Sequence, residues 1–261
     1  EEIPNETEII IVPRGKTQES ERANALYVLL AHGVTIRNLD DVYMEVYGKM
    51  PLQEVSETWL LEHASQEPQL SRELQQAVTY ALAVLLQILF IPLELLIALA
   101  IKLTSKGPVI YKQIRTGRDG KPFTLYKFRT MYEDAEEKGP QWARKKDPRV
   151  TPIGAFLRHT HLDEFPQLFN ILKGELSFVG PRPERPEFEQ QLEKEIPYYK
   201  ARQLVHPGIT GWAQVSYRYS STIEHAKEKL EYDLYYLRYR SATLDVFILL
   251  KTIKTLFTTP K

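Results

Sequence analysis

The sequence predicts an α/β protein that associates with a membrane. Three observations support this prediction: a strand–helix–strand pattern near the N-terminus, an apolar segment at residues 77–101, and a mainly helical remainder divided by glycine and proline. Lys and Arg together number 34, as do Asp and Glu, so the net charge is zero and no preference for nucleic acid follows. The absence of cysteine excludes disulfides and thiolate metal sites.

Residues 1–66 are interpreted as the end of an α/β domain. Residues 8–13 (EIIIVP) predict a buried strand, residues 17–33 a helix closed by Gly33, and residues 34–39 a second strand. A strand, a helix and a strand in this order are typical of a parallel sheet. No GxGxxG motif is present, so nucleotide binding there has no support. The chain begins with Glu rather than Met, so we expect this domain to be truncated.

The apolar segment at residues 77–101 has only four exceptions to its apolar character, Thr79, Gln87, Pro92 and Glu94. A straight helix of this length would extend about 37 Å, enough to cross the hydrocarbon core. Pro92 removes one helical hydrogen bond and should kink or break the helix. These residues leave two arrangements open, a full crossing and a re-entrant hairpin that returns to the same face. A carboxylate at Glu94 costs several kcal/mol in a membrane unless it has a partner.

The segments that follow alternate between short strands and helices. Residues 102–131 predict one or two basic strands, with turns at 106–108 and 119–120, lying near anionic lipid. Residues 223–239 (IEHAKEKLEYDLYYLRY) predict a helix. Residues 244–257 (LDVFILLKTIKTLF) predict either an interfacial helix or one that faces the core.

Four segments carry charged residues, glycine or proline that a plain core element would not need. They are KFRTM (127–131), LRHTHLDEFPQLFN (157–170), GELSFVGPRPERP (174–186) and HPGITGWAQV (206–215). In this order, after an apolar helix interrupted by proline, they resemble the bacterial sugar transferases, the monotopic phosphoglycosyl transferases that act on polyprenyl phosphate. The resemblance covers residues 72–258. The segment after WAQV lacks the more usual Asn-Gly-Arg and resembles the exopolysaccharide branch.

The resemblance implies the roles of individual residues. Asp163 of the LDE motif matches the catalytic nucleophile, and Glu164 matches its partner. The residues that match basic positions of the active site are Lys127, Arg129, Arg158 and Arg182. The family's membrane helix is re-entrant and kinked at a proline that matches Pro92, although Ile91 replaces the usual serine before it.

The resemblance also implies the domain organisation. Residues 1–66 would be the C-terminal part of a Rossmann-like domain and its linker, as in the large members of the family. Residues 67–104 would form the re-entrant membrane helix, residues 105–243 the mostly helical catalytic domain with short strands, and residues 244–261 an amphipathic interfacial helix.

The chemistry of these residue types supports the resemblance. A carboxylate nucleophile splits one difficult transfer between two phosphates into two easier steps. Mg²⁺ prefers oxygen ligands, so Glu164 is the expected protein ligand, and Mn²⁺ could substitute. Arginine grips phosphate oxygens with two donors, as lysine cannot.

We therefore expect transfer of a sugar 1-phosphate from a UDP-sugar to undecaprenyl phosphate, in contact with membrane lipid. The expected location is the cytoplasmic face of the bacterial inner membrane, where this would be the first membrane step of exopolysaccharide or related glycan assembly. A homodimer is compatible with this expectation. Two alternatives stay open, a glycosyltransferase that releases UDP and a non-catalytic scaffold of a polysaccharide assembly complex.

Overall fold

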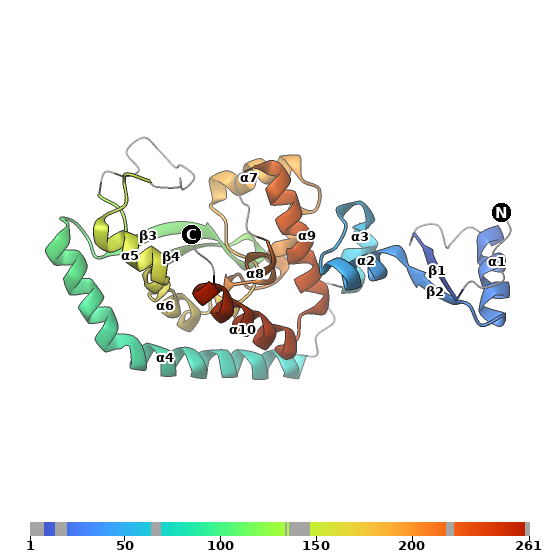
Figure 1. The fold of residues 1–261 in the computed structure, drawn as a ribbon, viewed down its shortest axis with the longest axis horizontal. Helices are drawn as coiled ribbons and strands as arrows, with labels where there is room; N and C mark the ends of the chain where they lie inside the picture. The colour runs from blue at the N-terminus through green and yellow to red at the C-terminus, as the bar shows by residue number, and fades with distance from the viewer. Residues whose placement is uncertain are drawn as a thin grey trace.

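The structure is a computed structural model that describes residues 8–13, 20–63, 69–133, 135, 147–217 and 222–258. The molecule is elongated (Figure 1). The first strands and helix form one end, the helices α7 to α10 form the middle, and the long helix α4 runs along the lower edge and turns upward at the other end.

The N-terminal end is a small parallel sheet with one helix. Strands β1 (Ile9–Val12) and β2 (Thr35–Asn38) pair in parallel, with Ile9 opposite Thr35, and α1 (Ser20–Ala31) connects them. The predicted strand–helix–strand pattern is therefore confirmed, while residues 17–19 of the predicted helix lie outside the described residues. Two strands and one helix do not by themselves define a Rossmann-like domain.

The next helices join the main hydrophobic core. They are α2 (Leu39–Tyr47), the 3₁₀ turn η2 (Leu52–Glu54) and α3 (Glu57–His63). Met44, Met50 and Trp59 are fully buried, in one cluster with side chains drawn from residues 179–248. This core therefore extends across the predicted boundary at residue 66.

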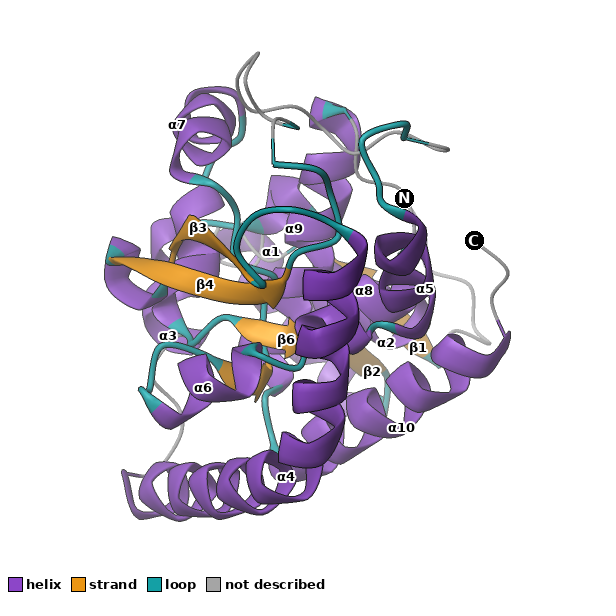
Figure 2. Cartoon of the chain, turned by 90° about the vertical axis from the view of Figure 1, so that its left-hand side faces the viewer, coloured by secondary structure: helices purple, strands orange, loops and turns teal. Residues whose placement is uncertain are grey.

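Helix α4 (Gln69–Thr104) contains the predicted apolar segment as one continuous helix of 36 residues. It bends around the body of the protein instead of folding into two antiparallel arms (Figures 1 and 2). Its inner face buries Ala83, Ile97 and Ile101. The helix also exposes apolar side chains, namely Leu74, Val78, Val84, Leu85, Ile88, Leu89, Ile91, Leu95, Leu96, Leu99 and Leu103. Among the described residues, only this helix is long and apolar enough to cross a membrane.

A β-hairpin and two short helices follow α4. Strands β3 (Ile110–Thr116) and β4 (Pro122–Phe128) pair antiparallel through the 3₁₀ turn η3 (Arg118–Gly120), which confirms the strands predicted in residues 102–131. Gly120 has φ 73°, a conformation that glycine adopts without steric cost. Helix α5 (Pro152–Thr160), the 3₁₀ turn η4 (Leu162–Glu164) and α6 (Gln167–Leu172) pack on this hairpin or on α4.

The remaining elements surround a second parallel strand pair. Strands β5 (Ser177–Val179) and β6 (Gly208–Thr210) pair in parallel, separated in sequence by α7 (Pro186–Glu195) and the 3₁₀ helix η5 (Tyr199–Leu204). The short α8 (Trp212–Ser216) and α9 (Ile223–Tyr239) follow, and α9 has the predicted bounds and buries Leu230 and Leu234 completely. Helix α10 (Ala242–Thr258) buries Ile248 and exposes other apolar side chains, namely Val246, Phe247, Leu250 and Ile253.

Candidate active site

The predicted dyad lies in a tight turn between α5 and α6. His161 ends α5 in the left-handed conformation, with φ 56° and ψ 15°, and redirects the chain into η4. On the two sides of the dyad, Leu162 and Phe165 pack against the cluster around Ile97. The ring of Phe165 also lies 4.6 Å from that of Phe90 in α4, measured between centroids. Asp163 and Glu164 are therefore fixed between two apolar contacts with the bent helix.

Two cationic side chains contact Glu164, and they come from segments that are distant in sequence. Lys127 of β4 donates a 2.7 Å hydrogen bond from Nζ to Oε1 of Glu164, and Arg182 donates one of 3.1 Å from Nη2 to the same oxygen. Asp163 is only 8% exposed and adds a favourable charge interaction with both cations. The structure therefore gathers two acids and two cations in one partly buried cluster. The outermost members in sequence, Lys127 and Arg182, are 55 residues apart.

Burial and charge act in opposite directions on these groups. Burial disfavours ionisation of Glu164, but Lys127 and Arg182 outweigh it and hold the pKa of this carboxyl well below its usual range. For Lys127, burial is the larger effect and lowers the pKa in spite of Glu164. Glu164 raises the pKa of Arg182. Glu164 is accordingly a carboxylate at neutral pH, with its charge balanced inside the site.

A buried asparagine connects α6, the helix that follows the dyad, to the strand that carries Lys127. Asn170 of α6 is fully buried. Its amide donates a 2.7 Å bond to the carbonyl of Thr124 and accepts a 3.1 Å bond from the backbone N–H of Tyr126. Asn170 thus acts as a partner strand would for β4. Sequence reasoning missed this residue, although its position within the apolar run QLFNIL was a signal.

The other two predicted basic residues have different surroundings. Arg158, on the last turn of α5, donates a 2.8 Å bond from Nε to the hydroxyl of Thr130. Arg129 lies just beyond the end of β4 and is 5% exposed. Its guanidinium binds the carbonyl and hydroxyl of Ser105, at 3.0 and 2.7 Å, and the carbonyl of Lys106. Arg129 therefore ties the chain after α4 to the end of the hairpin.

The donor set of the dyad fits Mg²⁺. Among the described residues, no group of three or more His, Cys, Asp or Glu side chains forms a protein-only metal site. Mg²⁺ is usually held by one or two carboxylates together with substrate phosphates, which matches the two adjacent acids. Both bonds that Glu164 accepts go to Oε1, so Oε2 is the atom that it can offer to a metal.

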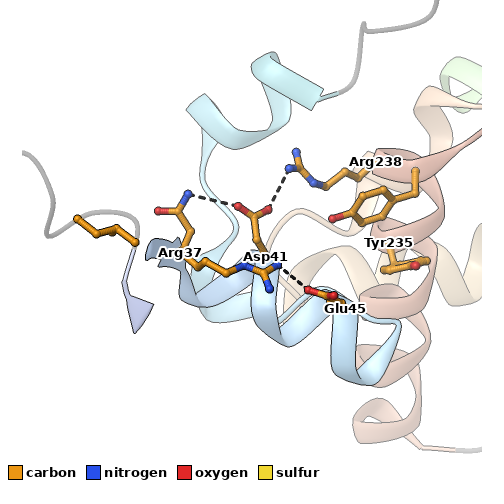
Figure 3. A pocket seen from close by; sticks show the side chains of 8 residues that line it. Arg37, Asp41, Glu45, Tyr235 and Arg238 are labelled. Carbon is orange, nitrogen blue, oxygen red and sulfur yellow. Dashed lines mark hydrogen bonds and ion pairs between the residues drawn. The ribbon is translucent and has the colours of Figure 1, made fainter. Parts of the chain in front are cut away.

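A separate cavity of about 520 Å³ lies near the N-terminal end, between β2, α2 and α9 (Figure 3). Its charges are paired internally: Arg37 contacts Glu45 at 2.5 Å, and Arg238 contacts Asp41 at 3.0 Å. The acids that line it, Asp41 and Glu45, are four residues apart, and each is paired with its own arginine. The chemistry therefore points to the cluster around Glu164 as the candidate active site.

Comparison with known proteins confirms the resemblance found in the sequence. The family described as bacterial sugar transferase matches residues 70–259. The chain is 46% identical over 170 residues to the UDP-N-acetylgalactosamine-undecaprenyl-phosphate N-acetylgalactosaminephosphotransferase of Aeromonas hydrophila, covering 65% of this chain and 40% of that protein. It is 44% identical over 185 residues to the UDP-glucose:undecaprenyl-phosphate glucose-1-phosphate transferase of Escherichia coli (strain K12), covering 70% of this chain and 40% of that protein.

Another relative has a higher identity over a shorter aligned stretch. The chain is 54% identical over 112 residues to a putative undecaprenyl-phosphate N-acetylgalactosaminyl 1-phosphate transferase of Bacillus subtilis (strain 168), which covers 43% of this chain and 63% of that protein. The match to each of the first two relatives spans about two fifths of the relative's length.

Proposed function

Since the chain belongs to the bacterial sugar transferase family, we propose that it transfers a sugar 1-phosphate from a UDP-sugar to undecaprenyl phosphate. The names of its relatives support this donor and this acceptor. The observation that carries the proposal is the buried dyad, in which Asp163 stands beside a carboxylate neutralised by Lys127 and Arg182.

In the proposed first step, a carboxylate oxygen of Asp163 attacks the phosphorus that bears the sugar. A bond forms between this oxygen and phosphorus, while the bond to the bridging oxygen of the diphosphate breaks. The electron pair leaves with the bridging oxygen, so UMP is released and the phosphosugar is held as an acyl phosphate on Asp163. The rigid setting of η4 supports this role, because a nucleophile must be held in line with its leaving group.

In the second step, an oxygen of undecaprenyl phosphate attacks the same phosphorus. The bond to Asp163 breaks and the carboxylate is restored, which gives undecaprenyl diphosphate sugar. Each step brings one anion toward phosphorus, so cations at the site are needed throughout. Lys127 and Arg182 are those cations. Arg158, whose Nε binds the hydroxyl of Thr130, would add a third.

We further propose that Glu164 holds Mg²⁺ together with the substrate diphosphate. When bound, this ion would neutralise phosphate charge and polarise the phosphoryl oxygens. The protein's own contribution is to keep Glu164 ionised, with one oxygen bound by two side chains and oriented by them.

The apolar surfaces support a site at the membrane. The exposed outer face of α4 forms the lower edge of the molecule, and α10 lies next to it on the same side (Figures 1 and 2). In our proposal α4 enters the cytoplasmic leaflet of the bacterial inner membrane and returns to the same face. Lys102, Lys106 and Lys112 follow the apolar segment and favour the cytoplasm. The dyad would then lie at the depth of the lipid head groups, where the phosphate of undecaprenyl phosphate is located.

The proposal is tested with sugar nucleotide alone, before any lipid is added. A panel containing UDP-glucose and UDP-N-acetylgalactosamine is mixed with the protein in nanodiscs, and nucleotide release is followed at early times. We expect one active donor to release UMP at no more than one equivalent per protein and to add one phosphosugar to a peptide containing residues 159–170. Asp163→Asn, which keeps the shape but not the nucleophilic charge, should abolish both the burst and the adduct.

The other readings predict different products. Release of UDP would identify a transferase that moves only the sugar. Release of UMP only after undecaprenyl phosphate is added, without an adduct, would indicate direct transfer and remove Asp163 as nucleophile. No turnover with any donor and acceptor would favour a non-catalytic scaffold in polysaccharide assembly.

A further inference from the structure

The segment that carries Arg182 has no regular secondary structure, yet each of its backbone carbonyls has a donor. Residues 181–184 follow β5 in the GPRPE sequence. The donors to the four successive carbonyls are the N–H of Gly208 at 3.0 Å, Arg202 at 2.8 Å, Arg115 at 2.9 Å and the N–H of Thr116 at 3.0 Å. Two of these donors are arginine side chains, Arg115 of β3 and Arg202 of η5.

The first of the four contacts depends on close backbone packing. A Cβ atom on Gly208 would lie 2.1 Å from the backbone nitrogen of Gly180, and one on Gly180 would lie 2.2 Å from the carbonyl oxygen of His206. Only glycine fits at these two positions, so the GPRP and HPGITG segments contact each other directly. The base of the segment is therefore fixed by backbone alone, and the position of Arg182 depends on the next contact.

That contact comes from Arg202 in η5. Arg202 is 5% exposed, and its Nη2 donates a 2.8 Å bond to the carbonyl of Arg182. The same Nη2 lies 3.0 Å from Oδ2 of Asp233, and Nη1 donates a 2.7 Å bond to the hydroxyl of Tyr199. The guanidinium is thus held by Asp233 and Tyr199 as well as by the carbonyl of Arg182.

Helix α9 holds both Arg202 and the segment that Arg202 contacts. Asp233 is 2% exposed and pairs with Arg202. Lys229, one turn earlier in α9, donates a 2.8 Å bond to Oε1 of Glu184. A single rigid helix therefore holds Glu184 directly and Arg182 through Arg202.

We propose that Arg202, fixed by Asp233, is a positioning residue that sets Arg182 against Glu164. Its guanidinium contacts the backbone of Arg182, whose own side chain lies 3.1 Å from Glu164, and lies 3.9 Å from Glu184 of the same segment. Arg202 therefore acts on the site through the segment that carries Arg182. A lysine has a single donor group on a flexible stem and cannot reproduce the planar set of contacts to Asp233, Tyr199 and Arg182. The proposed reaction is the premise of this inference.

A double-mutant cycle tests the proposal. The single-turnover rate of UMP release is measured for wild type, Arg202→Lys, Arg182→Ala and the double variant. Displacing a catalytic group by about 1 Å can cost on the order of 100-fold in rate, so we expect Arg202→Lys to lose roughly 10- to 100-fold. In the Arg182→Ala background the same substitution should cost less than about twofold, because the group that Arg202 positions is already absent.

Controls separate position from folding. Arg202→Lys keeps the buried charge opposite Asp233 but leaves buried acceptors without their donor, so its melting temperature should fall. Its rate is therefore measured per folded molecule, at a temperature where thermal unfolding shows that the variant is folded. Asp233→Asn, which keeps the shape but releases Arg202, should reproduce the rate loss. Lys200→Ala removes a side chain of the same element that is 70% exposed and paired with Glu193, and should leave the rate unchanged.

The failures of the two proposals are distinguishable. Absence of UMP release by wild type would contradict the proposed function. Release by wild type, with Arg202→Lys losing the same factor in both backgrounds, would show a general structural role and overturn the positioning proposal. A wild-type rate in Arg202→Lys would overturn it as well.

Discussion

Gln87 donates a 2.8 Å hydrogen bond from its side-chain amide to Oε2 of Glu94, across the position of Pro92 in α4. Residues seven apart in a straight helix are separated by about 10 Å along the axis, which two extended side chains must span. Both residues are partly buried, and their neighbours Phe90, Leu93 and Ile97 pack into the core clusters. The helix bends around the body of the protein (Figure 1). The bond therefore closes the inner side of the helix where proline removes a backbone bond.

This bond should help to hold the bend. In Gln87→Leu the donor is lost, and we expect the two arms of α4 to adopt a wider range of angles. Spin labels at Val78 and Leu103, both exposed, would report this in nanodiscs as a longer and broader distance distribution. Glu94→Gln retains an acceptor and should keep the wild-type distribution. Identical distributions in Gln87→Leu and wild type would show that the bend needs no such bond.

The re-entrant arrangement makes a second prediction about α4. Its two flanks should face the same side of the membrane, because the bend returns the chain to the cytoplasm. The chain has no cysteine, so single cysteines at Gln76 and Lys106 can be labelled without background. Both should be protected from an impermeant periplasmic reagent in intact cells. Labelling at one position and not the other would establish a full crossing.

Local patterns predicted the parts of the fold that depend on neighbouring residues. The strand pair β1–β2, the hairpin β3–β4 and α9 were predictable because apolar periodicity and turn residues act over a few positions. The packing of Trp59 into a core with residues 179–248 was not predictable, because nothing near Trp59 in sequence specifies that contact. The partner of Glu94 is similar: Gln87 was visible in the sequence, but the geometry that joins them depends on the bend.

The candidate site was predictable where its residues form contiguous motifs. Asp163 and Glu164 are adjacent, and Lys127 and Arg182 lie in short motifs, so the resemblance assigned them directly. Arg202 and Asp233 are 31 residues apart and meet only because η5 packs on α9. The resemblance also grouped Arg129 with the active-site residues, but its guanidinium binds the backbone of Ser105 and Lys106, a contact that nothing near Arg129 in sequence specifies.

Removal of metal should stop the reaction. Because Glu164 offers one oxygen and the dyad forms no protein-only site, Mg²⁺ should bind mainly with the sugar nucleotide. UMP release measured against Mg²⁺ concentration should fall to background in excess chelator. Glu164→Gln should raise the half-saturating concentration by roughly 10-fold or more. Glu187→Gln, at an acid whose side chain is 59% exposed, is the matched control. Full activity in excess chelator would remove the metal from the proposal.

Lys127 and Arg129 should behave differently although they are two residues apart. Lys127→Met removes a cation that touches the dyad, so the single-turnover rate per folded molecule should fall about 100-fold. Arg129→Met leaves the carbonyls of Ser105 and Lys106 without their donor, so it should lower the melting temperature instead. Its rate per folded molecule should stay within about threefold of wild type. A large rate loss in folded Arg129→Met would support a direct role at the phosphates.

Glu184 should make the protein sensitive to acid. Burial disfavours its charge, but Lys229, Arg202 and Arg115 outweigh burial and lower its pKa to about 2. A carboxyl whose pKa is lower in the folded state stabilises the fold above its unfolded pKa of about 4.3, and this contribution disappears as the pH falls toward 2. The shift corresponds to on the order of 3 kcal/mol at neutral pH.

Glu184→Gln should therefore lower the melting temperature at pH 7, and the difference from wild type should shrink steadily between about pH 4.5 and 2. Glu187→Gln should show no comparable pH dependence, because that side chain is 59% exposed. An offset between Glu184→Gln and wild type that stays constant over this range would mean that the charge of Glu184 does not stabilise the segment that holds Arg182.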